Sequence, residues 1–428
     1  MGDARHKTAN KTLIGPKKKI ALVCSGGGSK AGAFHLGVAL ALQEAGFRFY
    51  GGTAPAEGPV PTPGPMDISA YVGSSAGSMI SSYLASGYSL QNIFNSFAGK
   101  KATDPIDEYP KPLPKLTYQK MFKLRPEIAK EQLSQFLFIK NIFSDLVDGN
   151  LSSLLKFRWM KATGLFSTAG VEQFLRDDVL PTNEFKELLA DLFIVATKLN
   201  HSRKVVFGKY NYQPPPHDLT CQYDNHCKIS EAVAASIALP FIFAPYSIKS
   251  QDGQTHYYID GEVRDTLSTH VAIDAGADLV IASYTHQPYH YAKEIGSLTE
   301  HGLPVILIQS IYLLIEQKIN NHIHNKQIQR EAITSVDRYC KDQGVSEHHR
   351  KRILEIMEAE LHHRMDVDTI YIHPPASDPQ MFIHEHFSLS PKKLTEIARC
   401  GFRAAAEILK RYEFADHKKQ PPVGVASI

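Results

Sequence analysis

Two short apolar runs, each followed by a glycine-rich turn and a helical pattern, constrain the fold of this chain most strongly. The first run, residues 19–25 (KIALVCS), is almost continuously apolar, and residues 33–45 (AFHLGVALALQEA) have apolar side chains at helical spacing. After a Gly/Pro-rich loop at 51–66 the unit recurs, because residues 68–72 (ISAYV) lead through a Gly/Ser turn into a helical pattern at 79–87. Such units are typical of parallel strands connected by helices.

Further strand patterns continue the alternation, with helical patterns between most of them. The sequence therefore predicts an α/β fold, a three-layer sandwich with a mostly parallel central sheet flanked by helices. The stretch 191–210 can also form an antiparallel hairpin within that sheet. The additional strand patterns occupy residues 191–199, 204–210, 256–260, 278–284 and 369–373.

The remaining segments suggest one domain with additions. We expect a flexible basic N-terminus at 1–18, a single domain at 19–415 and a flexible tail at 416–428. Helical additions are expected at about 90–165 and about 311–365. The first of them carries apolar side chains among basic ones, which suits either a lid at a lipid surface or a helix packed on the core. These side chains are Met121, Phe122, Phe136, Leu137, Phe138 and Ile139.

Composition argues against several classes of partner and site. The 428 residues include 47 Lys and Arg against 44 Asp and Glu, a balance that predicts no nucleic-acid partner. The five cysteines are scattered and odd in number, so reduced thiols are expected rather than a disulfide framework. No metal and no cofactor is predicted. The cysteines are Cys24, Cys221, Cys227, Cys340 and Cys400.

No targeting signal stands out near the N-terminus. Residues 1–19 lack the apolar stretch of a secretory signal peptide, and His6 occupies the position where a myristoylated protein has Ser or Thr. The most apolar run, residues 303–315, is shorter than the roughly 20 residues of a membrane-spanning helix. We therefore expect a cytoplasmic or peripherally membrane-associated protein without a signal peptide or transmembrane segment.

The second turn, Gly73-Ser74-Ser75-Ala76-Gly77, matches the Gly-x-Ser-x-Gly pattern of serine hydrolases. A serine hydroxyl becomes a nucleophile only when a base takes its proton and its oxygen is aimed at the substrate carbon. A strand is predicted before this turn and a helix after it, which is the context that exposes such a serine. Ser75 is therefore the candidate nucleophile.

The first turn, SGGGSKAG at 25–32, places backbone N–H groups at a predicted helix N-terminus, where anions bind. Its spacing fits neither a phosphate-binding Walker loop nor a dinucleotide fingerprint. The anion that remains is the oxyanion of acyl transfer, for which each preorganised N–H contributes roughly 3–4 kcal/mol.

The residues alone leave the base open. Twenty histidines are compatible with a Ser-His-Asp triad, and His256, His270 and His286 lie near predicted strand ends. Asp260 and Gly261 follow the strand HYYI, so a carboxylate lies at a strand end, where active-site groups of α/β folds collect. Without further information, Asp-Gly in that place is interpreted as a turn.

Five segments follow one another along the chain in a recognisable order. They are GGGSK at 26–30, AGAFHLGVALALQEAG at 31–46, GSSAG at 73–77, ISEAVAASIALPFIFAP at 229–245 and YIDGEVRD at 258–265. Taken together, these segments resemble the patatin-like phospholipase family. The resemblance covers roughly residues 19–85 and 165–285, including GADLVIAS at 276–283, and is weaker at 387–410.

The resemblance implies a serine acyl hydrolase that releases fatty acids from lipid and phospholipid esters at a membrane or micelle surface. It makes Ser75 the nucleophile and Asp260 its proton acceptor in a dyad without a catalytic histidine. An acyltransferase with the same dyad, or a non-catalytic lipid-binding protein on the same fold, is the alternative. The oligomeric state is not predicted.

The resemblance also assigns the oxyanion loop. The residues matching the family's oxyanion-hole loop are Gly26, Gly27, Gly28 and the basic residue Lys30, and those supporting the other motifs are Gly73, Gly77 and Gly261. One departure is Ala31, because the family usually has Gly directly after the basic residue. The stretch ASIALP at 235–240 is expected beneath the active site.

Overall fold

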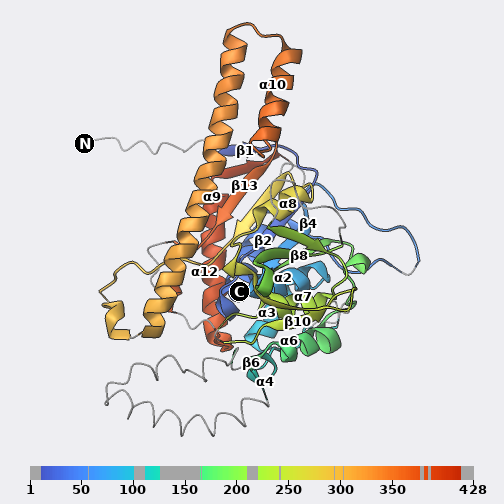
Figure 1. Cartoon of the computed structure of the whole chain (residues 1–428), viewed down its shortest axis with the longest axis vertical. Helices are drawn as coiled ribbons and strands as arrows, with labels where there is room; N and C mark the ends of the chain where they lie inside the picture. The colour runs from blue at the N-terminus through green and yellow to red at the C-terminus, as the bar shows by residue number, and fades with distance from the viewer. Residues whose placement is uncertain are drawn as a thin grey trace.

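The two strands predicted before the glycine-rich turns, β2 (Ile20–Cys24) and β4 (Asp67–Ser74), lie side by side at the centre of one sheet. The computed structural model describes residues 11–55, 57–100, 111–125, 164, 166–209, 220–240, 242–293, 295–301, 303–375, 380–383 and 387–415. The strands parallel to this central pair are β12 (Leu279–Ser283), β13 (Asp368–Ile372), β7 (Asp191–Lys198) and the short β3 (Arg48–Phe49). The mostly parallel sheet is thus confirmed (Figure 1).

Antiparallel strands extend the sheet beyond β7. The main path runs β10-β11-β7-β4-β2-β12-β13, and β8 and β9 branch from β7. The stretch 191–210 forms the antiparallel hairpin of β7 with β8, the alternative that the sequence had left open. These strands are β8 (Arg203–Phe207), β9 (Cys221–Asp224), β10 (Tyr246–Lys249) and β11 (Thr255–Asp260).

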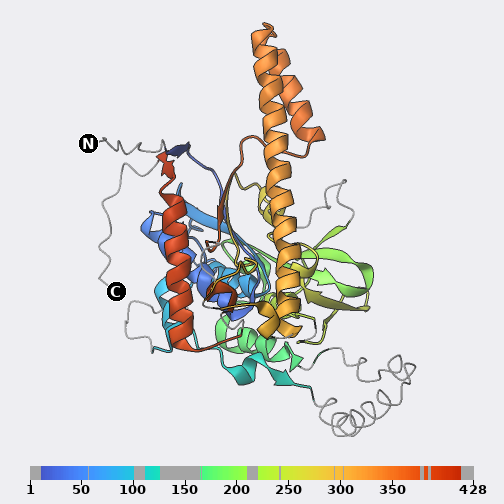
Figure 2. The ribbon, with the colours of Figure 1, turned by 90° about the vertical axis from the view of Figure 1, so that its left-hand side faces the viewer.

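Helices cover both faces of the sheet. In β2, Leu22 and Cys24 belong to one buried apolar cluster, whereas Ala21 and Val23 belong to another on the opposite face, as expected for a strand buried on both sides. In Figure 2 the last long helix, α12 (Pro391–Leu409, red), lies at one edge of the body, and the long α9 (Leu303–Asp342, orange) crosses in front of its middle. The first face is covered by α1 (Gly28–Glu44), α2 (Ala76–Ala85), α3 (Leu90–Ala98) and α12 (Pro391–Leu409), the second by α8 (Thr269–Asp274) and α9 (Leu303–Asp342).

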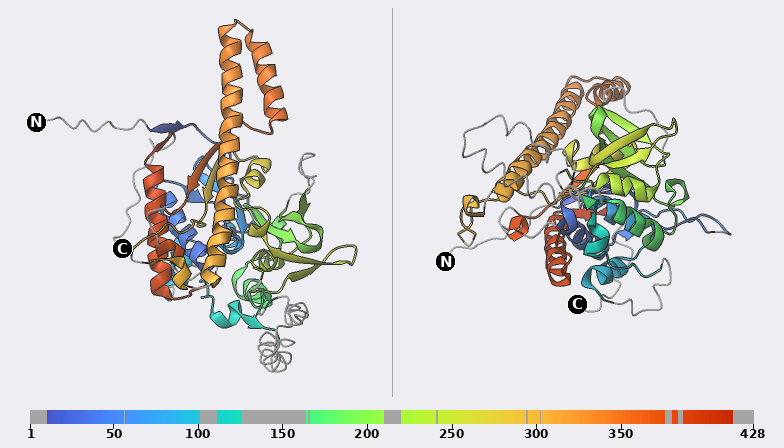
Figure 3. Two further views of the ribbon diagram at one scale, coloured as in Figure 1. Left: turned by 60° about the vertical axis from the view of Figure 1, so that its left-hand side comes forward. Right: turned by 60° about the horizontal axis from the view of Figure 1, so that its bottom comes forward.

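The predicted helical region near 311–365 consists of α9 and α10 (Glu347–Glu360). The two helices form a hairpin that extends beyond the sheet (Figures 1 and 3). The helix α9 begins earlier than predicted and includes the whole apolar run 303–315. Among the helices in the described part of the chain, none is long and apolar enough to cross a membrane.

The predicted insertion at 90–165 is described only in part. It contains α3, α4 (Tyr118–Met121) and β5 (Lys123–Leu124), which pairs with β6 (Phe166–Ser167). Phe136, Leu137, Phe138 and Ile139 lie outside the described residues. In the described part of the chain, the other helical elements are α6 (Ala169–Phe174), α7 (Ile229–Ser236), α11 (Gln380–Ile383) and the short turns Leu175–Val179, Phe185–Glu187, Leu199–His201, Gly261–Val263 and Leu298–His301.

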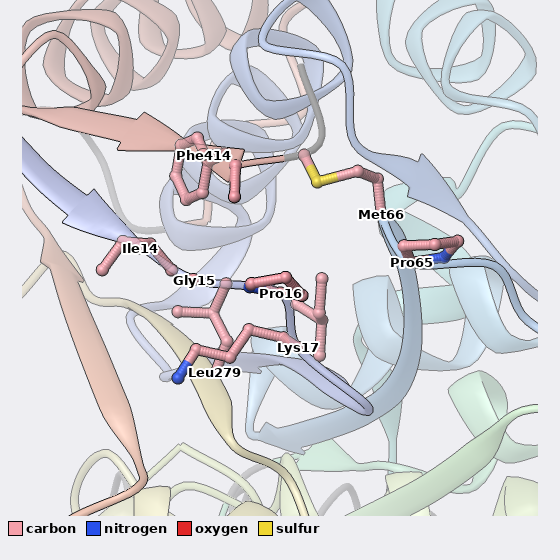
Figure 4. A pocket seen from close by; sticks show the side chains of 10 residues that line it. Ile14, Gly15, Pro16, Lys17, Pro65, Met66, Leu279 and Phe414 are labelled. Carbon is pink, nitrogen blue, oxygen red and sulfur yellow. The ribbon is translucent and has the colours of Figure 1, made fainter. Parts of the chain in front are cut away.

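Part of the N-terminal stretch differs from the sequence prediction of flexibility. Strand β1 (Thr12–Ile14) pairs in parallel with β14 (Tyr412–Phe414) near the other end of the described chain. The side chains of Ile14 and Phe414 are buried, and this apolar burial holds the strand in place. Both residues line a small pocket of about 10 Å³, which is a volume that one water molecule could fill (Figure 4).

The close packing of α1 on α12 gives a stability prediction. A Cβ on Gly37 would collide with the carbonyl oxygen of Ala398. Gly37→Ala is therefore expected to lower the free energy of unfolding by about 2–3 kcal/mol, measured by urea denaturation. Gly15→Ala is the matched control, because nothing lies within 4 Å of its added Cβ. Equal stability of the two variants would contradict the close packing.

Candidate active site

Strand β7 brings the two candidate residues of the dyad together. Its Val195 lies opposite Ser74, the last residue of β4, and its next residue, Ala196, lies opposite Asp260, the last residue of β11. Consecutive residues of one strand therefore hold the nucleophile turn and the Asp-Gly turn next to each other. The ends of these strands form the edge of the sheet where ligands of α/β folds bind.

Ser75 adopts the strained backbone of a nucleophile turn. Its φ and ψ angles are 50° and −129°, and a positive φ is uncommon in a residue other than glycine. Its N–H donates to the Ser236 hydroxyl at 2.8 Å, and its carbonyl accepts from the Ser78 hydroxyl at 2.6 Å. A Cβ on Gly77 would collide with the Cys24 carbonyl oxygen, so this glycine allows the turn to approach β2. Strand, sharp turn and helix are arranged as predicted.

Asp260 is buried and faces Ser75. Burial raises the pKa of its carboxyl from 3.8 to about 6, against the opposing effect of hydrogen bonds from the Ser75 hydroxyl and the Glu262 N–H. The Glu262 N–H donates to Oδ1 of Asp260 at 3.0 Å. The backbone of Asp260 is held by its own N–H, which donates to the Ala238 carbonyl at 3.0 Å. A carboxyl with this pKa can exchange a proton near neutral pH.

The predicted segment 235–240 does lie beneath the site. Besides the Ser236 hydroxyl and the Ala238 carbonyl, it contributes Ile237, Leu239 and Pro240 to the wall of the cavity beside the nucleophile. The Ser236 hydroxyl itself donates to the Val195 carbonyl at 2.6 Å, which connects the nucleophile turn to β7.

The three glycines of the first turn take different places. Gly27 caps α1, and Gly27 and Gly28 line the cavity beside Ser75. The N–H of Gly26 is already bound, because it donates to Oε1 of Glu262 at 2.7 Å. The additional residue Ala31 lies fully buried in the first turn of α1 and thus in the helix rather than the loop.

The Lys30 side chain contacts segments other than the turn that carries Ser75. Its ammonium group donates to the Met381 carbonyl at 2.8 Å and to the Tyr312 hydroxyl at 3.2 Å. Burial lowers the pKa of Lys30 from 10.5 to about 7. Lys30 is not among the residues that line the cavity, so its position is that of a link between α1, α9 and α11.

The three histidines near strand ends have different surroundings. His256 lies in β11 against another histidine, and His270 contacts Lys204 and Asp265. Only His286 lines the cavity, where its Nδ1 lies 4.0 Å from Oε2 of Glu262. Among the described residues, no histidine hydrogen-bonds to the nucleophile or to its aspartate.

A cavity of about 1190 Å³ lies beside Ser75 and Asp260. These two residues and Glu262 are part of its lining, and most of the other lining side chains are apolar. Met121 from the partly described insertion belongs to the wall, and Phe122 beside it packs on Phe166, Phe243 and Phe387 with ring centroids 5.0–5.7 Å apart. The apolar lining also includes Met79, Ile80, Phe97, Leu116, Val171, Ile308, Ile311, Leu314 and Leu394.

Two residues with direct contacts in the site escaped the sequence interpretation. Ser236 lies in an apolar stretch and gave no signal of its own. Glu262 follows Asp260 by two positions, and a second carboxyl so close to a strand end is a signal that could have identified it. Within the described residues, no cluster of three or more His, Cys, Asp or Glu side chains could hold a metal ion, and all five cysteines are buried free thiols.

Comparison with known families agrees with this geometry. The family described as patatin-like phospholipase matches residues 22–273, more than half of the chain. The match includes both glycine-rich turns, the segment beneath the site and the Asp-Gly turn. The chain therefore belongs to the patatin-like phospholipase family, a family of lipid acyl hydrolases.

Proposed function

We propose that the protein hydrolyses acyl esters of glycerolipids, phospholipids among them, with Ser75 as nucleophile and Asp260 as proton acceptor. The observation that carries the proposal is the register of β7, which holds Asp260 against the strained Ser75 turn. The large apolar cavity at this point suits an acyl chain, because burial of its methylene groups stabilises the bound substrate by about 0.8 kcal/mol each.

The reaction follows from the groups at hand. Oγ of Ser75 attacks the ester carbon while Asp260 accepts its proton, and the carbonyl oxygen becomes an oxyanion. The tetrahedral intermediate collapses, the leaving alcohol takes the proton from Asp260, and an acyl-enzyme remains. Water then attacks the acyl-enzyme, Asp260 accepts a proton from that water, and the proton returns to Ser75 as the fatty acid leaves.

We assign the oxyanion to the N–H groups at the start of α1 and α2. Gly27 and Gly28 line the cavity at the N-terminus of α1, and Ala76 does so at the N-terminus of α2. N–H groups in the first turn of a helix have no partner four residues back, and the helix dipole favours negative charge there. The N–H of Gly26 is excluded because Glu262 accepts it.

The rim of the cavity supports a lipid surface as the source of substrate. Four side chains that line the cavity are also exposed, namely Tyr118, Val263, Ile311 and Leu314, and the adjacent Leu313 of α9 is exposed as well. Two cations, Lys115 and Lys318, lie in the same lining. Exposed apolar side chains beside cations favour contact with an anionic membrane or micelle surface.

Covalent labelling tests the nucleophile independently of the substrate. An alkyl fluorophosphonate should react with Ser75, whose Oγ displaces fluoride, so peptide mass spectrometry should locate one phosphonate on the Ser75 peptide. Ser75→Ala should abolish the label. Ser86→Ala is the matched control, because the hydroxyl of this buried serine of the same segment has no hydrogen-bond partner among the described residues and lies outside the cavity lining. A label that persists in Ser75→Ala would refute the assignment.

Product analysis then distinguishes the two possible acceptors. With phosphatidylcholine vesicles we expect free fatty acid, both with and without an added alcohol. A new ester as the main product in the presence of alcohol would identify the protein as an acyltransferase that uses the same dyad.

A further inference from the structure

Glu262 contacts all three segments of the candidate active site. Its Oε1 accepts hydrogen bonds from the Gly26 N–H at 2.7 Å and from the Ser74 hydroxyl, and its own N–H donates to Asp260. A Cβ built on Gly26 would lie 2.7 Å from both Cγ of Glu262 and Cβ of Ser75, so the glutamate side chain lies directly beside the nucleophile. One carboxyl group therefore connects the oxyanion loop, the nucleophile turn and the Asp-Gly turn.

The second oxygen of this carboxyl has a different environment. Oε2 of Glu262 is buried without a hydrogen-bond partner among the described residues, and so is Nδ1 of His286, 4.0 Å away. Both side chains line the cavity. A neutral carboxyl with its proton on Oε2 would have an imidazole nitrogen 4.0 Å away, whereas an ionised carboxylate would leave a buried negative charge unpaired.

We propose that Glu262 is a positioning residue that, in its neutral form, holds the oxyanion loop against the nucleophile turn without adding a second negative charge. The inference rests on the proposed function of Ser75 and Asp260. Asp260 must be ionised to accept a proton, and the substrate oxygen becomes negative during the reaction. An ionised Glu262 would add a second negative charge beside Asp260 before the attack, and beside the oxyanion once Asp260 has taken the proton, and it would repel that oxyanion.

The surroundings of the two carboxyls favour an ionised Asp260 and a neutral Glu262. Burial, and then the neighbouring Asp260, raise the pKa of Glu262 from 4.5 to about 8, although hydrogen bonds from Ser74 and Gly26 oppose the shift. Asp265 on the same turn acts in the same direction as Asp260, and Tyr312 of α9 also faces the carboxyl.

Among the described residues, no cation is one of the groups that shift the pKa of Glu262. Burial, with the nearby Lys30 and His35, lowers the pKa of His286 to about 3, so the imidazole that faces Glu262 is neutral. Lys30 itself binds Tyr312 and Met381 rather than Glu262. Between about pH 6 and pH 8, Asp260 is thus ionised while Glu262 stays neutral. Pairs of carboxyls with separated pKa values are how active sites assign two roles to one kind of group.

The pH profile of Glu262→Gln tests the inference. Wild-type kcat should rise through about pH 6 as Asp260 ionises and fall through about pH 8 as Glu262 ionises. Glutamine keeps an acceptor oxygen for Gly26 and Ser74 but cannot ionise. The variant should therefore lose the alkaline fall and keep the acid limb, with kcat at pH 7 lowered by only a few-fold.

A second variant tests the contacts themselves. Glu262→Ala removes the acceptor of the Gly26 N–H and should lower kcat about 100-fold across the pH range, with KM changed by less than about threefold, because the oxyanion donors lose their alignment. Glu44→Gln makes the same substitution at an exposed position at the end of α1 and should retain the wild-type profile. Circular dichroism checks that each variant is folded. If Glu262→Ala is unfolded, the pH profile of Glu262→Gln by itself tests the inference.

The outcomes separate this inference from the proposed function. If Ser75 is labelled and required, but the Glu262→Gln profile keeps the wild-type alkaline fall, the role of Glu262 is wrong and the dyad stands. Glu262→Ala with wild-type kcat leads to the same conclusion. If Ser75→Ala hydrolyses esters like the wild type, the proposed function itself is wrong, whatever the Glu262 variants do.

Discussion

Ser75→Ala is expected to lower kcat/KM for ester hydrolysis by about 10⁴- to 10⁶-fold, because the variant has no oxygen to form the acyl-enzyme. The residual rate would come from the oxyanion donors and substrate binding alone. Initial rates on a short-chain nitrophenyl ester and fatty acid release from phosphatidylcholine vesicles measure the effect. The short-chain ester separates chemistry from binding at the lipid surface.

The control for this experiment must leave the turn intact. Ser86 lies at the C-terminal end of α2, and the Ser86→Ala variant should hydrolyse both substrates like the wild type. Wild-type rates in Ser75→Ala would mean that another residue forms the acyl-enzyme. If the rate of fatty acid release from vesicles fell while the rate on the short-chain ester stayed unchanged, Ser75 would affect only lipid binding.

Asp260→Asn is expected to lower kcat by about 10³- to 10⁴-fold. The amide has the shape of the carboxyl and can still hydrogen-bond to the Ser75 hydroxyl, but it cannot accept the proton. The acid limb of the pH profile near pH 6 should disappear in the residual activity, because the group that titrates there is gone. Rates between pH 4 and pH 9 measure both effects.

Asp260→Asn should also stabilise the protein. A loss of activity in a more stable variant would then come from the lost proton acceptor and not from unfolding. The pKa of Asp260 is higher in the folded chain, about 6, than its ordinary value of 3.8, so the ionised carboxyl destabilises the fold as the pH rises from about 4 to 6. Asparagine removes this cost. We expect Asp260→Asn to raise the free energy of unfolding by roughly 2–3 kcal/mol at pH 7, and by nothing at pH 3, in urea denaturation.

Histidine variants provide the contrasting outcome. His256→Asn and His270→Asn should leave activity within about twofold of the wild type, because neither side chain lines the cavity. An inactive histidine variant together with an active Asp260→Asn would replace the dyad by a Ser-His-Asp triad.

Much of the fold follows from local patterns in the sequence. The apolar run 19–25 became β2, the run 68–72 became the centre of β4, and the helical patterns behind them became α1 and α2. Periodicity and glycine placement are local properties, so they can be identified without knowing what packs against them. The β1–β14 pair was missed because its partners lie at opposite ends of the described chain.

The sequence by itself determined the sharp turn that carries Ser75. Gly73, Ser75 and Gly77, between a strand and a helix, specify a sharp bend that exposes one hydroxyl, and this geometry requires only neighbouring residues. The family resemblance extended the prediction to Asp260. The residues alone had not identified the base that takes the serine proton. A carboxylate and a histidine at strand ends are equally good candidates until the pairing of the strands shows which of them lies near Ser75.

Only the tertiary structure decided which groups meet Ser75. The pairing of β7 with both β4 and β11 brings Asp260 to Ser75, and the fold of the Asp-Gly turn directs Glu262 to the Gly26 N–H. It also turned Lys30 toward α9 and α11 and not into the cavity. Burial, which shifts the pKa values of Asp260 and Glu262 to different extents, is a property of the whole packed molecule. Strand register and burial depend on contacts between distant segments, and no local pattern specifies them.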